Sequence, residues 1–289
     1  MDGIFTVPAD TAGRQMMRDK LSSDTGIYPV SLGKSILGRD IEVYYIGKGD
    51  RRVAFFGAHH AAESITCNLL FAFMHALLTE KIETHGTVAR LLLRAYTFTV
   101  VPCVNPDGIE LRLHGTENSP LAARQRKMAE NFDLWQANAR GVDLNHNYDL
   151  GFYAYKSLES EQGISPGATR YSGEYPESEP ESKSAANLVR CTSPSAVLSL
   201  HSQGEEIYYS PRTPRTARIA QRLCAITGYT PRIPEGTAAY GGLCDYTGSL
   251  GIPSFTLEVG RGKNPLPESE IPRIAGELFP ALALFPTML

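Results

Sequence analysis

The chain has 289 residues, of which 42% are hydrophobic and 20% are charged, and its formal net charge is -3. A chain of this length and composition can bury a sizeable core as one large domain. The small negative charge, and the lack of a basic stripe interleaved with aromatic residues, argue against nucleic-acid binding. No apolar stretch approaches the length of a membrane span, so no membrane association is expected.

The cysteines and the first residues bear on the cellular compartment. Five cysteines, odd in number and scattered, do not fit a disulfide framework, so a reducing environment is expected. The segment 1–8 lacks the charged and then apolar pattern of a signal peptide. These features predict a cytoplasmic protein, and they leave its oligomeric state open.

Apolar and β-branched runs predict strands, and longer patterns of helical period predict helices between them. Residues 1–30 are mixed and polar, and they predict an amino-terminal extension with a helix near 13–21. The predicted strands cover 41–46, 53–57, 95–101, 196–200, 206–210 and 254–259, and the predicted further helices cover 65–78, 181–190, 216–227 and 268–284. This alternation predicts a single α/β domain over 1–289, with a mixed, mostly parallel sheet flanked by helices.

Two long stretches between the predicted elements are interpreted as loop insertions. The stretch 114–130 is predicted to carry a helix, and 150–175, which is rich in glycine, serine, proline and tyrosine, is predicted to form an active-site rim. The alternative for both is a loop without a role in function.

His60 and Glu63 stand three residues apart, shortly after the apolar run 53–56 that is predicted to be a buried strand. A His-x-x-Glu pair in this position places an imidazole and a carboxylate where both can reach one cation, and zinc accepts that pairing. Any chain with seven histidines also produces such a spacing by chance. The pair alone is therefore a weak indication of a metal site.

His201 and Glu258 strengthen the metal-site hypothesis. His201 follows the apolar run 196–200, and open α/β sheets place their sites at the edge where such strands end. Glu258 is a single carboxylate in the apolar run 253–260, and a buried carboxylate needs a cation or a catalytic role to offset the cost of burial. The alternative for His201 is a hydrogen-bonded core histidine. The alternative for Glu258 is a glutamate that faces solvent or pairs with Arg261.

Six blocks of sequence occur in the order typical of one enzyme family. They are His60-Ala61-Ala62-Glu63, Asn105-Pro106-Asp107-Gly108, Gly141-Val142-Asp143-Leu144-Asn145, Leu200-His201-Ser202-Gln203, Tyr240-Gly241-Gly242 and Thr256-Leu257-Glu258-Val259. On these blocks the chain resembles the zinc carboxypeptidase-type metallopeptidases, the M14 class, from about Leu32 to Pro267. One block alone is unconvincing, but the ordered set over most of the chain is highly specific.

Within that class the chain is most similar to the bacterial γ-D-glutamyl-diamino acid peptidases, which cut cell-wall peptides. The blocks that carry this similarity are 57–60, 135–145, 201–208 and 258–267. The resemblance implies a peptide or muropeptide substrate and hydrolysis of a γ-D-glutamyl-diaminopimelate type of linkage.

The resemblance also implies roles for individual residues. His60, Glu63 and His201 would hold one Zn²⁺ per chain, with water as the fourth ligand. Asp143 matches the family's aspartate that takes the N–H of the ligand His60; its alternative is a simple turn residue. Glu258 would act as the general base on the zinc-bound water and then pass the proton to the departing amine.

The chain departs from the digestive carboxypeptidases at the position that grips the substrate's free carboxylate. There the family has Asn-Arg, and this chain has Asn145-His146. A histidine cannot make the planar two-pronged contact of an arginine, and it is neutral for much of the range near pH 7. Gln136 replaces a second arginine of the family. Arg140 is therefore the predicted cation that stabilises the oxyanion or holds the carboxylate of a diamino acid. The alternative is that Arg140 forms an ion pair at the surface.

Two further departures concern the specificity pocket. The tyrosine that covers the substrate in the digestive enzymes falls at Thr237, and Tyr240 is the predicted substitute, with plain packing as the alternative. The lysine usual in the cell-wall subfamily is replaced by Cys244, which would line the pocket or be inert filler. The lost positive charge weakens the expectation of an acidic substrate.

The sequence therefore predicts a zinc metallopeptidase that hydrolyses an amide next to a diamino acid. The first alternative is a general metallocarboxypeptidase or an N-acyl amino acid deacylase of the same fold, and the second is a catalytically inactive binding module. The block Asn105-Pro106-Asp107-Gly108 is interpreted as a turn. His59 is interpreted as a neighbour of the metal ligand and not as a ligand.

Overall fold

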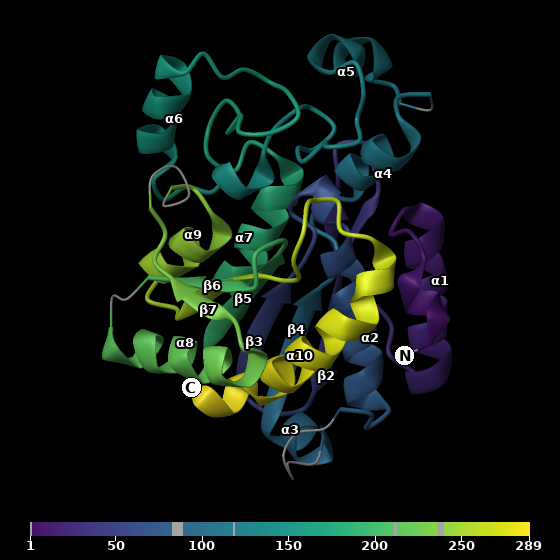
Figure 1. Cartoon of the computed structure of the whole chain (residues 1–289), viewed down its shortest axis with the longest axis vertical. Helices are drawn as coiled ribbons and strands as arrows, with labels where there is room; N and C mark the ends of the chain where they lie inside the picture. The colour runs from purple at the N-terminus through teal and green to yellow at the C-terminus, as the bar shows by residue number, and fades with distance from the viewer. Residues whose placement is uncertain (1, 83–88, 118, 211–212, 236–239) are drawn as a thin grey trace.

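The computed structural model describes residues 2–82, 89–117, 119–210, 213–235 and 240–289, and within them an eight-stranded sheet crosses the molecule (Figure 1). The strand order is β1-β2-β4-β3-β5-β8-β6-β7. The β3–β4, β3–β5, β5–β8 and β6–β7 pairs are parallel, and the other pairs are antiparallel. The strands are β1 Val30–Lys34, β2 Asp40–Gly47, β3 Arg51–Phe56, β4 Tyr96–Val101, β5 Ala196–His201, β6 Glu206–Tyr209, β7 Thr230–Arg232 and β8 Ser254–Glu258. The predicted mixed, mostly parallel sheet is confirmed.

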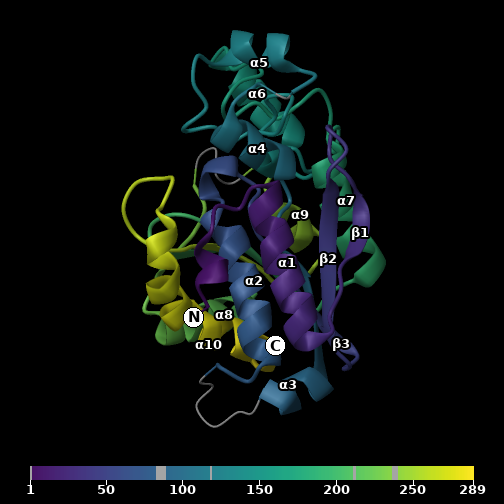
Figure 2. The same ribbon diagram turned by 90° about the vertical axis from the view of Figure 1, so that its right-hand side faces the viewer.

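Helices cover both faces of the sheet because the inner strands are apolar on both sides. In β3, Val53 and Phe55 belong to one hydrophobic cluster, and Ala54 and Phe56 belong to a second cluster on the opposite face. Residues of α1, α2, α8 and α10 complete the first cluster, and residues of α7 and α9 complete the second. Figure 2 shows α1 and α2 on one side of β2 and α7 on the other. The helices are α1 Thr11–Thr25, α2 Ile65–Leu78, α3 Ala89–Ala95, α4 Pro106–His114, α5 Ala122–Met128, α6 Phe152–Glu161, α7 Pro180–Thr192, α8 Pro214–Thr227, α9 Leu243–Ser249 and α10 Ile271–Leu284.

The predicted strands correspond to β2, β3, β4, β5, β6 and β8, and the predicted helices correspond to α1, α2, α7, α8 and α10. The edge strands β1 and β7 were not predicted. Both are short and have no buried residue, so they lack the apolar alternation that identifies a strand in a sequence.

The block Asn105-Pro106-Asp107-Gly108 begins helix α4, so its interpretation as a turn is wrong. The Asn105 side-chain oxygen accepts a hydrogen bond from the N–H of Gly108 at 2.9 Å, and proline occupies the first turn. The side-chain amide of Asn105 also donates to the carbonyl of His59 at 3.0 Å. This capping residue therefore holds the segment that leads into the site.

The stretch 61–78 is long and apolar enough to cross a membrane by length and composition, with a mean hydropathy of 1.4. The expectation that no stretch approaches this length is therefore wrong. The stretch forms a short 3-10 helix, η2 (Ala61–Glu63), followed by α2, and 89% of it is buried inside the fold. Because α2 contacts both α1 and α10, its apolar surface is that of a core helix.

The two stretches interpreted as insertions lie at one end of the molecule, at the top of Figure 1. The first, 114–130, contains α5, and the second, 150–175, contains α6. Both views place these helices at the same end, which is also the end that carries α4. The second stretch reaches the candidate site described below.

Candidate metal centre

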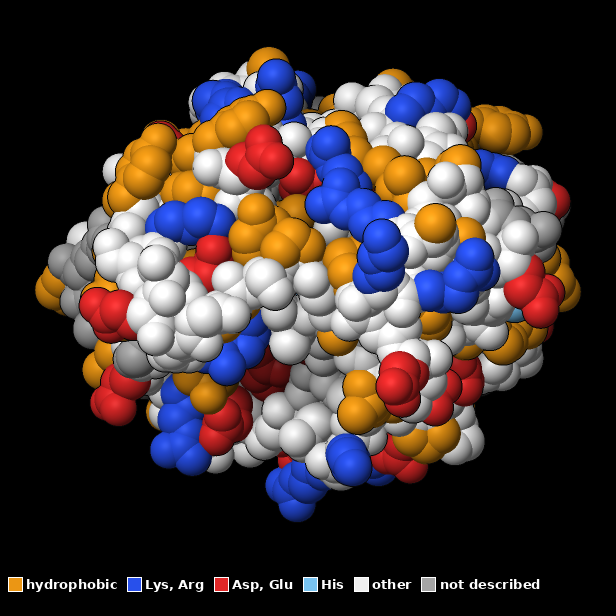
Figure 3. All heavy atoms as spheres, turned by 90° about the horizontal axis from the view of Figure 1, so that it is seen from above, with side chains coloured by type: hydrophobic (Ala, Val, Ile, Leu, Met, Phe, Trp, Pro, Cys, Tyr) orange, Lys and Arg blue, Asp and Glu red, His pale blue; other side chains and the backbone are white. Residues whose placement is uncertain are grey.

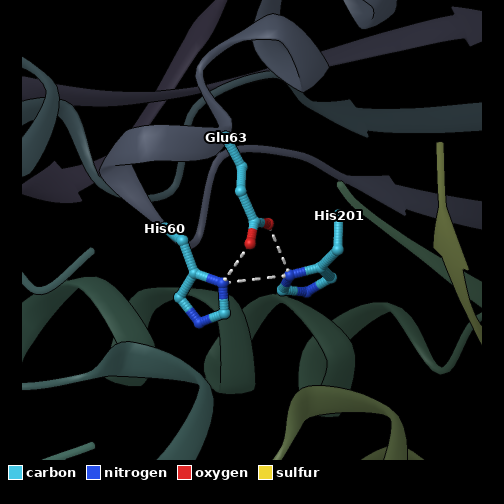
Figure 4. Close-up of side chains that lie close together, drawn as sticks. All are labelled: His60, Glu63 and His201. Carbon is cyan, nitrogen blue, oxygen red and sulfur yellow. Dashed lines mark hydrogen bonds and ion pairs between the residues drawn. The ribbon is translucent and has the colours of Figure 1, made fainter. Parts of the chain in front are cut away.

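His60, Glu63 and His201 are brought together by two neighbouring strands (Figure 4). His60 and Glu63 follow β3, and His201 is the last residue of β5. Because β3 and β5 are paired in parallel, their carboxyl ends meet at one edge of the sheet. The ligand atoms of the three side chains lie within 4.8 Å of one another.

Both imidazoles present their Nδ1 atoms to the Glu63 carboxylate. Nδ1 of His60 lies 2.9 Å from Oε1, Nδ1 of His201 lies 2.9 Å from Oε2, and the two nitrogens are 3.3 Å apart. Nε2 of His60 lies 3.1 Å from Oδ1 of Asp143, and it carries the hydrogen because a carboxylate only accepts. In a neutral His60, Nδ1 therefore carries a lone pair, and this lone pair faces the Glu63 carboxylate, which is also an acceptor. A cation between Nδ1 and the carboxylate would bind both groups.

This donor set fits zinc. Two imidazole nitrogens and one carboxylate are the protein ligands of many catalytic zinc ions, which keep a further position for water. Glu63 and His201 are buried, and His60 is half-buried beside a cavity. The site is thus both enclosed by protein and reachable by a substrate.

The charges around the three side chains also favour a cation. Burial alone would raise the pKa of Glu63, but His60 and His201 outweigh it and lower that pKa to about 2. Burial alone would lower the pKa of His60, but Glu63 and Asp143 outweigh it and raise that pKa well above its usual value. Both shifts arise because carboxylates and imidazoles share a space from which water is excluded.

Asp143 is buried and is held on both of its oxygens. Oδ1 accepts from Nε2 of His60 at 3.1 Å and from the N–H of Asn145 at 3.2 Å. Oδ2 accepts from the hydroxyl of Thr169 at 3.0 Å and from the N–H of Arg170 at 2.9 Å. Burial would raise the pKa of Asp143, but His60 and these bonds hold it well below its usual range. An ionised, fixed carboxylate orients the His60 ring.

Replacing Asp143 by alanine is expected to weaken zinc binding about 10- to 100-fold, because His60 loses the group that fixes its tautomer and orientation. Competition with a zinc-chelating dye measures the affinity. Asp149→Ala, at an exposed acidic residue of the same segment, is the matched control and should bind zinc as the unchanged protein does. If the two variants bound zinc equally well, Asp143 would have no orienting role.

Glu258 is the last residue of β8, and its register partner on β5 is His201. Its side chain is half-buried and lines a cavity of about 260 Å³ beside the metal-ligating residues. Burial, and then the charge of Glu63, raise the pKa of Glu258 well above its usual value. Within the described ranges its carboxylate has no hydrogen-bond or ion-pair partner, and Arg261, the alternative partner, pairs with Glu205.

The cavity is acidic in character. Its lining includes the carboxylates of Asp245 and Glu258, and the lining residues that the structure describes include no lysine or arginine. Figure 3 views the end of the molecule that carries α5 and α6, where the surface is hollowed near the centre and acidic side chains lie in the hollow. Elsewhere on this face the two signs of charge are interspersed.

Three of the predicted substrate-binding residues line this cavity, namely Asn145, His146 and Cys244. The Asn145 side-chain oxygen accepts from the N–H of Leu243 at 3.2 Å. Nδ1 of His146 donates to the backbone carbonyl of Tyr240 at 2.9 Å. Burial raises the pKa of Cys244 to about 12, so its thiol is neutral at physiological pH.

Tyr240 and Arg140 do not belong to the cavity lining. Tyr240 is 37% exposed, and its backbone carbonyl is the group that takes part in the site. The Arg140 guanidinium pairs with Glu179 at 2.9 Å and donates to the carbonyl of Ser178 at 3.3 Å. To reach an oxyanion, Arg140 would have to leave both partners. Thr237 lies outside the described residues.

His59 lies beside the metal-ligating residues without joining them. Its Nε2 atom is 2.9 Å from the hydroxyl of Tyr148, and its ring stacks on His201 with centroids 5.5 Å apart. Burial, and then the neighbouring His201 and His60, keep the pKa of His59 well below its usual value. The neutral, hydrogen-bonded His59 ring therefore packs against the candidate metal ligand His201.

Sequence reasoning missed the residues that hold the site together. Tyr155, in α6, stacks on His146 with ring centroids 3.9 Å apart and an interplanar angle of 7°. Thr169 and Arg170 hold the aspartate behind the metal site. All three belong to the second stretch interpreted as an insertion, whose tyrosine and glycine content predicted a rim. The residues of this stretch that point toward the site are determined by contacts with distant residues. Such contacts produce no pattern in the local sequence.

Comparison with known proteins agrees with this geometry. The family model of zinc carboxypeptidases matches residues 15–281. The chain is 31% identical over 287 residues to gamma-D-glutamyl-L-diamino acid endopeptidase 1 of Lysinibacillus sphaericus, a match that covers 93% of this chain and 70% of that protein. It is 27% identical to carboxypeptidase B of Bos taurus, a match that covers 83% of this chain and 60% of that protein.

Solved structures show the same fold. Bovine thrombin-activatable fibrinolysis inhibitor, in complex with tick carboxypeptidase inhibitor, matches with a TM-score of 0.77 at 20% identity, over 98% of this chain and 97% of that chain. Murein-tripeptide amidase MpaA from Escherichia coli O157 matches with a TM-score of 0.57 at 20% identity, over 88% and 91%. Because the family match spans most of the sequence and the ligand set is present, the chain belongs to the zinc carboxypeptidase family of metallopeptidases, hydrolases that act on peptide bonds.

Proposed function

We propose that this protein is a zinc-dependent peptidase that hydrolyses an amide bond next to a diamino acid in peptidoglycan-derived peptides, of the γ-D-glutamyl-diaminopimelate type. The observation that carries the proposal is the convergence of the His60 and His201 imidazoles and the Glu63 carboxylate beside a cavity that Glu258 also lines. The name of the Lysinibacillus sphaericus relative supports the substrate class.

The residues around the cavity divide the chemistry between holding the metal and moving a proton. His60, Glu63 and His201 would hold a zinc ion, which would lower the pKa of a bound water. Glu258 would accept a proton from the water that attacks the amide carbonyl, and it would deliver the proton to the amine nitrogen as the carbon–nitrogen bond breaks. The raised pKa of Glu258 suits the second step, because a poorly solvated carboxylate holds a proton well. Asp143 keeps the His60 ring oriented.

The groups that line the cavity support a substrate with an amino group. The side chains of Asp245 and Glu258 line it, and their carboxyl oxygens are hydrogen-bond acceptors for an ammonium group on the residue that follows the scissile bond. Cys244 stands where the cell-wall subfamily usually has a lysine, so that source of positive charge is missing from the pocket. These features favour a diamino acid on the departing side.

A general metallocarboxypeptidase is the second candidate, because carboxypeptidase B of Bos taurus is 27% identical to the chain. Such an enzyme grips a free C-terminal carboxylate with a cation. His146 occupies that position in the family pattern, and the described part of the cavity lining offers no permanent cation. This arrangement favours the first candidate.

A mass-spectrometric digest with zinc-loaded protein tests the proposal. The substrates are a meso-diaminopimelate tripeptide, its lysine counterpart and an ordinary α-linked peptide, each with and without a chelator. Release of diaminopimelate or lysine from the γ-linked peptides, abolished by the chelator, is the expected result. Cleavage of the α-linked peptide alone would favour a general carboxypeptidase. No cleavage by the zinc-bound protein would favour a deacylase or a binding module.

A further inference from the structure

The Glu63 carboxylate has a hydrogen-bond donor besides the two imidazoles. The backbone N–H of Ser202, the residue that follows His201, donates to Oε2 of Glu63 at 3.3 Å. A zinc ion would take the lone pairs of His60 and His201, so the bond from Ser202 is the one of these contacts that would still hold the carboxylate by a hydrogen. The orientation of Glu63 therefore depends on where the Ser202 peptide group lies.

Asn264 holds Ser202 by two hydrogen bonds. The Ser202 hydroxyl donates to Oδ1 of Asn264 at 2.8 Å, and Nδ2 of Asn264 donates to the backbone carbonyl of Ser202 at 2.6 Å. Because a carbonyl only accepts, the second bond fixes which end of the Asn264 amide faces Ser202. Ser202 is buried, so these bonds are shielded from water. Two bonds to one residue restrain both the position and the rotation of its peptide group.

Asn264 belongs to the segment that follows Glu258, and the start of this segment lies against the end of β5. The N–H of Val259 donates to the carbonyl of His201 at 2.8 Å. Asn264 is not among the residues that line the cavity, so it is not placed to contact a substrate there. Its contact with the site is through Ser202.

We propose that Asn264 is a positioning residue of the metal site, which holds the Glu63 carboxylate toward the cation through Ser202. A carboxylate that is restrained before the ion arrives loses less conformational freedom when it binds, so the site binds zinc more tightly. This inference rests on the zinc site of the proposed function and not on its substrate. It gives the block 258–267 a role beyond that of Glu258.

Replacing Asn264 by alanine is expected to weaken zinc binding about tenfold, at the lower end of the effect of residues that orient a metal ligand. Competition with a zinc-chelating dye measures the dissociation constant of the folded protein. Asn131→Ala makes the same change at an exposed asparagine and should bind zinc as the unchanged protein does. Equal affinities of Asn264→Ala and the unchanged protein would overturn the proposal.

Ser202→Ala tests whether the effect passes through Ser202. This variant loses the hydroxyl, but it keeps the backbone N–H that donates to Glu63 and the carbonyl that accepts from Asn264. It should weaken zinc binding, but by less than Asn264→Ala does. The double variant should bind zinc as Asn264→Ala does, because Asn264→Ala already removes both bonds. If the two losses multiplied in the double variant, Asn264 would not act through Ser202.

Urea unfolding of the zinc-free variants separates this positioning role from a purely structural one. A structural role alone would lower the free energy of unfolding of Asn264→Ala and leave the zinc affinity of the folded protein unchanged, which would contradict the proposal. If Asn264→Ala does not fold, Ser202→Ala carries the test, and an unchanged zinc affinity of that variant would contradict it too. These measurements use no substrate, so a failure of the proposed peptidase activity is distinguishable from a failure of this inference.

Discussion

Replacing Glu258 by glutamine is expected to lower kcat about 10²- to 10⁴-fold while the fold and zinc binding are kept. Glutamine has nearly the same shape, but it cannot take a proton from the attacking water. The residues that could hold a metal ion are His60, Glu63 and His201, so the loss of the Glu258 carboxylate leaves this set intact. Steady-state kinetics with a γ-D-glutamyl peptide and metal analysis of the purified variant measure the two quantities.

Glu206→Gln is the matched control for this variant. Glu206 is the register partner of Glu258 on the neighbouring strand β6, so the two substitutions remove the same charge at the same level of the sheet. Its carboxylate accepts from the hydroxyl of Tyr208 at 2.8 Å and pairs with Arg232 at 2.7 Å, outside the cavity lining. The control should hydrolyse at close to the unchanged rate, because the charge of Glu206 makes the smallest of the named contributions to the pKa of Glu258. Undiminished hydrolysis by Glu258→Gln would exclude Glu258 as the general base.

The stability of the folded chain is expected to fall as the pH rises from about 5 to about 8, and Glu181→Gln is expected to remove much of this fall. Glu181, near the start of α7, is completely buried. Burial, with the nearby carboxylates of Asp107 and Glu179, raises its pKa to about 8. The folded chain therefore holds this carboxyl group in its protonated form at neutral pH.

The direction of the effect follows from comparing the folded and unfolded chains. A glutamate in an unfolded chain has a pKa of about 4.3, so between about pH 4 and about pH 8 only the folded chain keeps the proton on Glu181. Stability then falls by about 1.4 kcal/mol per pH unit and is lower by roughly 3.6 kcal/mol at pH 7 than in acid. Glutamine does not ionise, and its side-chain oxygen still accepts from the N–H of Ile36, a bond of 3.2 Å for Glu181.

Urea unfolding of the unchanged protein and of Glu181→Gln across this pH range measures the difference in the free energy of unfolding. The two proteins should be similar near pH 5, and the variant should be the more stable one near pH 8. Glu161→Gln, at an exposed position in α6, is the control and should follow the unchanged protein. If the curves of the unchanged protein and Glu181→Gln ran parallel, Glu181 would be ionised in the folded chain.

Local patterns were sufficient to predict the elements with a continuous apolar signature. The run 53–56 is buried on both faces of the sheet, and its continuous apolar character and its β-branched or aromatic residues are visible in the sequence. Parallel strands bring their carboxyl ends to one edge, so the meeting of His60 with His201 follows once the two strands are neighbours. The order of the strands was not predicted from the sequence.

Features that depend on distant partners were not predictable in this way. The spacing of Arg140 from Trp135 says nothing about Glu179, which takes the guanidinium in the folded chain. The sequence around Asn105 predicts a turn, whereas the hydrogen bond that its side chain accepts from Gly108 shows that it caps α4. In both cases one polar contact determines the role of the residue, and such a contact cannot be predicted from hydrophobic periodicity.

The stretch 150–175 supports two functions of the site at once. Thr169 and Arg170 hold Asp143 behind the metal ligands, and Tyr155 holds His146 in the cavity wall. Shortening this stretch, an obvious engineering route to a wider entrance for larger substrates, would therefore also loosen the support of the metal ion. We therefore expect substrate range and metal affinity to be coupled through this segment, so that redesign of one has to preserve the other.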